Sequence, residues 1–533
     1  MNAKREAQTM NANFPYLSRR MPVLAANVVA TSQPLASQAG MSMLARGGNA
    51  VDAVLAAAIA LVVVEPVNNG LGSDAFAIVA HDGELHGLNA SGRSPAAMTA
   101  ERFSGLSRMP MLGWDAVTVP GAVSAWVALS QRFGKLPFET LFEPAIGYAQ
   151  GGWLVSPVVA EQWAAVAGIF SGFDEWARVF LREGRAPRMG EQMRLPELAA
   201  SLREIAESHG ESLYRGRLAE AFVAASTAGG GLFSMDDLAS HRADWTAPIA
   251  KDFAGVRVHE IPPNGQGIAA LIALGILAHT EVLERALDSA ASLHLQIEAM
   301  KLAFADVHRA VADPAAMTAK AEDLLGDGYL AARAKLIDRS RAADFRAGKP
   351  ATGDTVYLCA GDQHGTMVSY IQSNYFAFGS GIVVPATGMS LQNRGSGFSV
   401  EPGHPNCIGP RKRPFHTIMP GFVTRDGAPL LAFGVMGGPM QPQGHLQMVL
   451  RIFGHAQNPQ AAADGPRWQV TEGRGVLVEE AVDVATREAL SALGHDLAIA
   501  PPLMFGGAQA ALRVDGGYVA ASESRKDGSV AGF

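Results

Sequence analysis

Cysteine is scarce in this chain of 533 residues, which contains only Cys359 and Cys407. Two thiols cannot cross-link a chain of this length, so a disulfide framework does not organise its fold. Cys359 lies in an apolar run typical of a core strand, and free cysteine is among the most buried residue types. We therefore expect two buried free thiols and a reducing compartment.

Long apolar runs are also missing. The most apolar segment, residues 53–64, is shorter than the roughly 20 residues that a membrane-spanning helix needs. Residues 1–20 carry charges but lack an apolar core of signal-peptide length, so we expect a disordered N-terminal tail. These features predict a cytoplasmic protein with no membrane partner.

The chain has no excess of positive charge. Its net charge is −7 and its pI is about 6.1, and the Lys and Arg residues are scattered among acids. Nucleic acid is therefore not an expected partner. Neither a Walker-type phosphate loop, nor a Gly-x-Ser-x-Gly elbow, nor a His-Glu-x-x-His zinc helix occurs in the sequence.

What the chain does have is enough apolar material for a large core, since 48% of its residues are hydrophobic. Apolar spacing predicts helices at 33–45, 51–63, 268–277 and 293–311, and through much of 120–239 and 320–345. The helix at 51–63 is apolar on nearly every face, which predicts complete burial. We interpret His294, Asp306 and His308 in the helix at 293–311 as surface polar residues, and 320–345 as exposed. No metal-ligand spacing connects the two histidines.

An abrupt change from loop to strand occurs at Thr355. Residues 346–354 are polar, contain Pro and Gly, and show no apolar periodicity. Residues 355–360 and 366–373 are rich in β-formers and flank a turn-forming segment, which predicts a β-hairpin. A hydroxyl residue that begins a strand behind a cleavable loop is what an N-terminal nucleophile requires, because cleavage frees an α-amine beside the hydroxyl. The alternative is an ordinary β-branched strand residue.

Motifs along nearly the whole chain support the first interpretation. After residue 354 they are Thr355–Asp362, Val368–Ser373, Phe378–Gly381, Lys412–Pro414 and Gly437-Gly438, and before it Leu35–Gly40, Leu44–Ala53, Glu65-Pro66 and Val119–Ala122, with Arg525–Gly528 near the end. In this order they resemble the γ-glutamyltransferase (glutathione hydrolase) family.

The resemblance implies an α/β (α+β) fold, a four-layer αββα sandwich of the N-terminal nucleophile hydrolase type. Self-cleavage between Asp354 and Thr355 would give a large fragment, residues 21–354, and a small fragment, residues 355–533. Both fragments would build the sandwich together. No metal and no organic cofactor is implied, and a homodimer of the processed pair is an open alternative.

The resemblance also implies catalytic roles. Thr355 would be the nucleophile for chain cleavage and for turnover. Ser373 would orient it, with a plain strand serine as the alternative. Gly437 and Gly438 would present backbone N–H groups to the tetrahedral oxyanion, with a simple tight turn as the alternative.

The substrate-binding positions depart from the family pattern. Arg93 resembles the family arginine that pairs with the substrate carboxylate, although a solvated loop arginine is the alternative. Enzymes that act on γ-glutamyl groups hold the ammonium with Asn, Glu or Gln, and Asp, where this chain has Tyr375, Arg394 and Gly397. His416 and Thr417 replace a Ser-Ser pair.

Compared with the family pattern, these positions have lost an acid and gained the cation Arg394. Burying the ammonium of a γ-glutamyl substrate beside this guanidinium should cost several kcal/mol. We therefore predict an amidohydrolase for a small anionic amide without an α-ammonium, either oxamate-like or glutaryl-like. A γ-glutamyltransferase or glutathione hydrolase, and an unprocessed binding protein with this fold, remain the alternatives. Arg394 could instead be a surface charge, and His416 a satisfied loop histidine.

Overall fold

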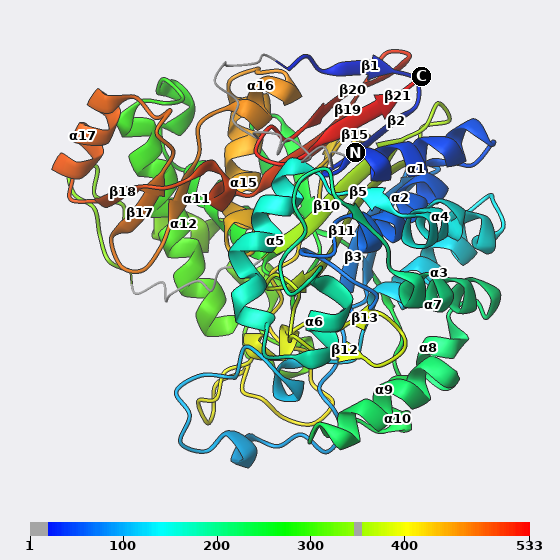
Figure 1. Cartoon of the computed structure of the whole chain (residues 1–533). Coiled ribbons are helices and arrows are strands. Elements are labelled where there is room, and N and C mark those ends of the chain that lie inside the picture. The colour runs from blue at the N-terminus through cyan, green and yellow to red at the C-terminus, as the bar shows by residue number, and fades with distance from the viewer. Residues whose placement is uncertain (1–19, 346–353) are drawn as a thin grey trace, which may run out of the picture.

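Two seven-stranded antiparallel sheets form the centre of the computed structural model, which describes residues 20–345 and 354–533. The first sheet has the order β21-β2-β10-β11-β3-β4-β7, with β2 (Val28–Thr31), β3 (Asp74–His81), β4 (Glu84–Asn89), β7 (Asp244–Thr246), β10 (Asp354–Gly361), β11 (Met367–Tyr375) and β21 (Ser529–Gly532). The second has the order β1-β20-β19-β15-β14-β9-β8, with β1 (Val23–Ala25), β8 (Ile249–Phe253), β9 (Val256–Glu260), β14 (Gly421–Arg425), β15 (Ala428–Met436), β19 (Gly507–Val514) and β20 (Gly517–Ser522). Helices lie on both outer sides of the stacked sheets (Figure 1).

The sheets pack through alternate residues of their strands. In β10, Tyr357 and Cys359 join a buried cluster with Phe422 and Ala432 of the second sheet. The intervening β10 residues, including Leu358, face the helices on the other side. This period of two places one face of β10 between the sheets and the other under the helical layer. The predicted four-layer αββα arrangement is therefore confirmed.

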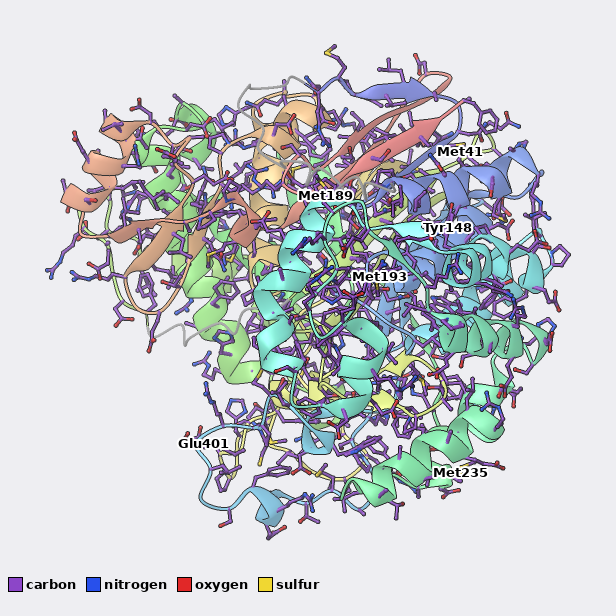
Figure 2. The ribbon with its side chains drawn as sticks, in the orientation of Figure 1. Met41, Tyr148, Met189, Met193, Met235 and Glu401 are labelled. Carbon is purple, nitrogen blue, oxygen red and sulfur yellow. The ribbon has the colours of Figure 1, made fainter. Side chains whose placement is uncertain are left out.

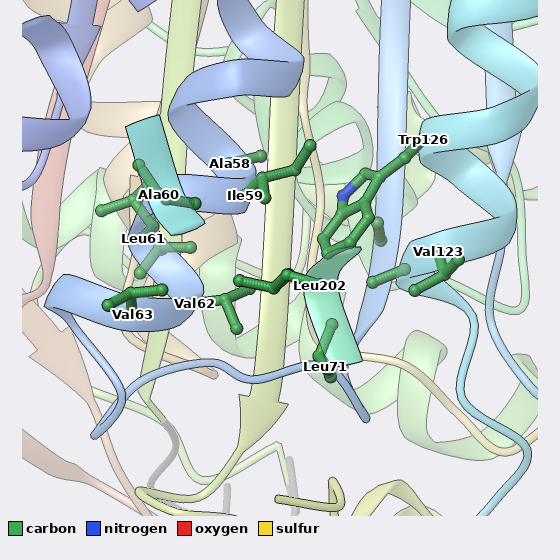
Figure 3. Close-up of a cluster of buried hydrophobic side chains, with 14 of the residues drawn as sticks. Ala58, Ile59, Ala60, Leu61, Val62, Val63, Leu71, Val123, Trp126 and Leu202 are labelled. Atoms are coloured by element: carbon green, nitrogen blue, oxygen red, sulfur yellow. The ribbon is translucent and has the colours of Figure 1, made fainter. Parts of the chain in front are cut away.

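The helical layer on the first sheet is centred on α2 (Ala50–Val64), of which all 15 residues are buried. Asn49 begins this helix, because its side chain accepts the backbone N–H groups of Val51 and Asp52. Figure 3 shows the apolar side chains of α2 packed with Val123, Trp126 and Leu202 of neighbouring helices. The burial predicted for residues 51–63 is confirmed.

The other helices on this side share one buried core with α2. They are α1 (Pro34–Ala45), α3 (Ala122–Phe133), α4 (Glu143–Gly151), α5 (Pro157–Phe170), α6 (Asp174–Phe180), α7 (Pro196–Glu207), α8 (Glu211–Arg215), α9 (Arg217–Ala228) and α10 (Met235–Ala239). Of these, α5 also contributes to a cavity that Thr355 lines. Met193, in the short pair β5 (Trp153–Leu154) and β6 (Gln192–Met193), lies among them (Figure 2).

The outer layer of the second sheet is built by α11 (Gly267–Leu277), α12 (Ala290–Ala310) and α15 (Met440–Val449). Shorter elements follow: α13 (Ala321–Leu324), α14 (Asp327–Ala334), α16 (Pro459–Asp464), α17 (Val484–Ala492), the small sheet of β16 (Trp468–Val470), β17 (Gly475–Val478) and β18 (Asp496–Ile499), and the pair β12 (Val383–Val384) and β13 (Met389–Ser390).

Two interpretations of this region are wrong in whole or in part. His294 and Asp306 are buried rather than exposed, because His294 bonds to His495 and to the Asp338 carbonyl, and Asp306 pairs with Arg333. The segment 320–345 is helical only in α13 and α14, and although most of its residues are exposed or half-buried as predicted, Leu324 and Leu330 pack into the core. Polar residues look exposed in a sequence when their partners lie far along the chain.

Both cysteines are free, as predicted, but only Cys359 is buried, whereas Cys407 is partly exposed. None of the helices formed by residues 20–345 and 354–533 is long and apolar enough to cross a membrane.

The predicted hairpin is confirmed as β10 and β11, which lie between β2 and β3 in the middle of the first sheet. Strands from both sides of residue 355 therefore share one sheet.

Residues 1–19 of the predicted tail 1–20, and 346–353 of the predicted loop 346–354, lie outside the described residues. Arg20 is bonded to the Glu523 and Gly528 carbonyls rather than disordered, and Asp354 already belongs to β10.

Candidate active site

Thr355 occupies an irregularity at the start of β10. Asp354 pairs with Tyr375 and Val356 with Gln372, so the register shifts between these two pairs. A bulge of this kind re-aims the side chain within it. The Thr355 hydroxyl donates to Ser373 Oγ at 3.2 Å, and the side chain is almost fully buried.

A second group contacts the same oxygen. Gln441 Nε2, from the first turn of α15, donates to Thr355 Oγ1 at 3.3 Å. Gln441 Oε1 accepts the Met419 backbone N–H at 3.0 Å, which fixes the orientation of the amide. Ser373 Oγ in turn accepts the Tyr375 backbone N–H at 2.8 Å. Sequence reasoning missed Gln441, and its only signal was a polar residue near the start of a helix after Gly437-Gly438.

The two glycines lie where β15 ends and α15 begins. Their φ angles are +116° at Gly437 and +57° at Gly438, in the left-handed region that favours glycine. A Cβ on Gly437 would come within 3.0 Å of Gly506. Within the described part of the chain, neither backbone N–H donates a hydrogen bond to a protein group. Both N–H groups thus lack a protein partner among the described residues, and Gly437 lines one cavity together with Thr355.

Two cavities adjoin these groups. The first, here called the Thr355 cavity, has a volume of about 240 Å³ and is lined by Thr355, Gly437, Glu161, Gln162, Ala165, Val166, Phe376, Met436, Gln469, Leu503, Met504, Gly506 and Lys526. The second, here called the Tyr375 cavity, has a volume of about 280 Å³ and is lined by Tyr375, Thr417, Gly397, Gln266, His308, Val311, Ser396, Phe398, Ser399, His404, Asn406, Phe415 and Pro439.

Arg394 lies behind the Tyr375 cavity, at the start of a 3-10 turn, Arg394–Gly397, and is 1% exposed. Its Nη1 donates to Thr417 Oγ1 at 2.6 Å, and its guanidinium carbon lies 4.9 Å from the Tyr375 ring centroid. Nε and Nη2 are buried and have no partner among the described residues. Burial lowers the Arg394 pKa to about 10, with Asp74 opposing the shift. The side chain stays charged at neutral pH, and the surface-charge alternative is wrong.

His416 belongs to a buried pair with Asp74. Its Nδ1 accepts the Ile418 N–H at 3.4 Å, so Nε2 carries the proton and faces Asp74 Oδ2 at 3.1 Å. Burial lowers the pKa of His416 well below its usual value. Burial also raises the Asp74 pKa to about 7, with Arg394 opposing the shift. His416 borders neither cavity, and its partner Asp74 is the acid whose charge opposes the lowering of the Arg394 pKa.

Arg93 lies elsewhere. It pairs with Asp313 at 2.8 Å, and its side chain is 43% exposed. It lines a third cavity with Arg411 and Arg413, in which Thr355 takes no part. The structure thus brings Thr355, Ser373, Gly437, Gly438, Tyr375, Arg394 and Thr417 together, and it places Arg93 apart from them.

A buried cluster away from this site has ligands that could hold a metal ion: His294, Glu298 and His495. The two histidines already share a hydrogen bond of 2.8 Å between their ring nitrogens. Lys301 Nζ lies 2.9 Å from Glu298 and supplies the positive charge. The charge of Glu298 is thus balanced by Lys301, and the cluster needs no metal ion for that purpose.

Comparison with known proteins identifies the family. The family model described as "Gamma-glutamyltranspeptidase" matches residues 36–533. A "Glutathione hydrolase-like YwrD proenzyme" of Bacillus subtilis is 36% identical over 95% of this chain and 98% of its own length. An "Oxamate amidohydrolase proenzyme" of Klebsiella pneumoniae is 35% identical over 94% of this chain and 97% of its own length.

Among solved structures, a cephalosporin acylase from Bacillus halodurans superposes with a TM-score of 0.94 at 46% identity, covering 99% of both chains. This likeness confirms the predicted N-terminal nucleophile hydrolase fold. The chain belongs to the gamma-glutamyltranspeptidase family, whose members are amide-bond hydrolases made as self-cleaving proenzymes.

Proposed function

We propose that the chain cleaves itself before Thr355 and then hydrolyses a small carboxylate-bearing amide, oxamate-like or glutaryl-like, through an acyl-enzyme. The observation that carries this proposal is Arg394. It is a buried guanidinium with two unpartnered nitrogens, and it contacts Tyr375 and Thr417, which line the Tyr375 cavity. The Tyr375 N–H in turn bonds Ser373, the partner of Thr355. A buried cation without a partner is costly, and a planar fork suits a carboxylate.

In the chain-cleavage step, Thr355 Oγ attacks the Asp354 carbonyl carbon and the Asp354–Thr355 C–N bond breaks. The hydroxyl proton passes to the departing nitrogen, which becomes the α-amine of Thr355. Water then hydrolyses the resulting ester, restoring the hydroxyl and leaving a carboxylate at Asp354. Gln441 Nε2 and Ser373 Oγ, both bonded to Thr355 Oγ1, hold the attacking oxygen in place.

In turnover, the freed α-amine, with a reference pKa of about 8, takes the hydroxyl proton as Oγ attacks the substrate carbonyl. The Gly437 and Gly438 N–H groups receive the developing oxyanion, a contribution of roughly 3 kcal/mol per donor. The amine product leaves with that proton. Water attacks the acyl-enzyme and releases the acid.

The acyl group would occupy the Tyr375 cavity, whose volume suits a small acid. Its carboxylate would accept from Nε and Nη2 of Arg394, with Thr417 and Tyr375 beside it. In this proposal His416 is a positioning residue, because it holds the Asp74 carboxylate that offsets the Arg394 charge. Direct binding by Arg93 would require its ion pair with Asp313 to open, so the proposal rests on Arg394.

Hydrolysis or transfer of γ-glutamyl groups is the second candidate, favoured by the Bacillus subtilis relative named glutathione hydrolase-like. The ammonium of a γ-glutamyl group would need an anionic side chain in the Tyr375 cavity. No carboxylate borders this cavity within the described residues, and the nearby Asp74 is already bonded to His416. We therefore propose an amide substrate that carries a carboxylate but no α-ammonium.

The test is a substrate panel on purified, processed protein: oxamate, a glutaryl anilide and the matching γ-glutamyl anilide, followed by ammonia or aniline release. We expect one of the first two to exceed the γ-glutamyl compound by at least tenfold in kcat/KM. A wide preference for the γ-glutamyl anilide would overturn the proposal. An intact single chain with no turnover would favour the binding-protein alternative.

The cytoplasmic location and the homodimer of the processed pair stay predictions.

A further inference from the structure

The Thr355 cavity contains two buried polar side chains that the mechanism above does not use. Lys526 is 5% exposed, and no hydrogen bond or ion pair within 4.0 Å joins its ammonium to any other described residue. Gln469 is 8% exposed, and neither its Oε1 nor its donor Nε2 bonds to another described residue. A lysine this buried is normally paired, so both groups are available to a ligand.

The described acids near Lys526 form no ion pair with it within 4.0 Å, although its charge opposes the rise that burial causes in the Glu65 pKa. Glu65 accepts from Ser32 and Asn68 and is engaged by them. Asp527 accepts the backbone N–H groups that begin α5, at 3.2 Å each. Glu161 also borders the cavity but is exposed, and it lies beyond ion-pair distance from Lys526. Lys526 thus lines the cavity with no described acid in direct ion-pair contact.

The rest of the wall is mostly apolar and adaptable. Val166, Phe376, Leu503 and Met504 contribute to it. Flexible methionine and leucine side chains accommodate ring-sized apolar groups. An apolar wall with a few convergent polar groups is typical of a small-molecule site.

An amide has two halves on either side of the carbonyl that Thr355 attacks. The acyl half would extend toward Arg394 in the Tyr375 cavity, which shares no lining residue with the Thr355 cavity. We propose that the Thr355 cavity binds the amine half, and that this amine has an apolar body and an anionic group that accepts from Lys526 Nζ and Gln469 Nε2. The assignment of halves rests on the proposed function in its glutaryl-like form, because oxamate would release only ammonia, but the ligand chemistry of the cavity does not rest on it.

The test uses two amides with the same acyl group and different amines, 4-aminobenzoate and the near-isosteric neutral 4-aminobenzamide. We expect the processed wild-type protein to prefer the carboxylate amine by about tenfold in kcat/KM, the effect of one charge-assisted contact. In Lys526→Met the ratio should fall to about one, and Lys526→Arg should retain it. Lys251→Met, which alters a lysine near Asp327 at 3.5 Å, is the matched control and should keep the ratio.

Equilibrium binding of the two free amines to processed protein gives a readout independent of turnover. The carboxylate amine should bind about tenfold more tightly, and Lys526→Met should remove the difference. Equal affinity in wild type, or a preference that survives in Lys526→Met, overturns this inference. A γ-glutamyl acyl preference together with the Lys526-dependent amine preference would instead overturn only the proposed function.

Discussion

Gln441 and Thr355 are 86 positions apart in the chain, yet Gln441 Nε2 lies 3.3 Å from Thr355 Oγ1. The contact joins the helix after the glycine pair to the predicted nucleophile. A donor to the attacking oxygen stabilises negative charge as the hydroxyl loses its proton. Gln441 is thus expected to matter both for chain cleavage and for turnover.

Gln441→Glu tests this role, because a carboxylate can still accept the Met419 N–H but cannot donate to Thr355 when ionised. We expect processing and kcat to fall at least tenfold at pH 8. Intact-mass measurements over time follow the processing. Gln447→Glu, in the same helix but bonded to Gln443 and Trp468, controls for a new acid in α15. Equal losses in both variants would assign the effect to folding.

Chain cleavage itself is the next prediction. Recombinant protein should give two fragments, of which the smaller begins at Thr355, as mass spectrometry would show. Thr355→Ala should abolish cleavage and activity together, because one hydroxyl serves both steps, whereas Thr355→Ser should retain part of each. A wild-type precursor that stays whole for days at neutral pH would contradict the prediction.

Gly438→Val tests the oxyanion donors. At a φ of +57° a β-branched residue would shift the backbone and move the N–H groups away from Thr355. Turnover by the processed variant should fall at least tenfold. Gly427→Val is the control, because Gly427 has a φ of +81° in an open turn with no atom near its absent Cβ. Similar turnover in both variants would show that the pair only makes a turn.

The acid stability of the fold depends on buried His241. Its Nε2 lies 3.0 Å from Ser124 Oγ, which itself donates to the Gly121 carbonyl, so Nε2 carries a proton and donates to Ser124. Burial, assisted by Arg413 and Arg93, lowers its pKa to about 3. The unfolded ring titrates near 6.5, so the unfolded state binds more protons below that pH, and stability is lost as pH falls from about 6.5 toward 3.

Between pH 7 and pH 5 this single histidine should account for about 2 kcal/mol of lost unfolding free energy. His241→Gln keeps a donor for Ser124 but does not titrate, so its urea unfolding curve should shift less between the two pH values. His279→Gln, which alters a histidine paired with exposed Asp327, should behave like wild type. An unchanged pH shift in His241→Gln would mean that other groups dominate acid unfolding.

These contacts show which features could be predicted from sequence. The burial of α2 and the β10–β11 hairpin follow from local apolar patterns, and both are confirmed. The burial of His294 by His495 and the Gln441 contact with Thr355 depend on pairing across 201 and 86 residues, which no local pattern records. The resemblance to the family pattern indicates Arg394 as a substrate-binding residue. Only the folded structure shows that two of its nitrogens lack partners among the described residues.

Arg394 also gives the sharpest test of substrate class. If its free Nε and Nη2 bind the substrate carboxylate, Arg394→Glu should abolish turnover of the anionic amide, since attraction becomes repulsion in a desolvated site. The same change places an acid near the position where the family holds an ammonium, so turnover of a γ-glutamyl anilide should rise relative to wild type.

The comparison uses oxamate, a glutaryl anilide and a γ-glutamyl anilide with wild type, Arg394→Glu and Arg425→Glu. Arg425 is exposed at the end of β14 and lies 5.9 Å from the Phe453 ring, so its variant controls for a charge reversal away from the cavities. Arg394→Met separates the loss of the cation from the gain of an acid, because it removes the attraction for the substrate carboxylate without adding repulsion. This variant should lose activity on the anionic amide and gain none on the γ-glutamyl anilide. Retention of anionic-amide turnover in both Arg394 variants, with correct processing, would exclude Arg394 as the carboxylate partner.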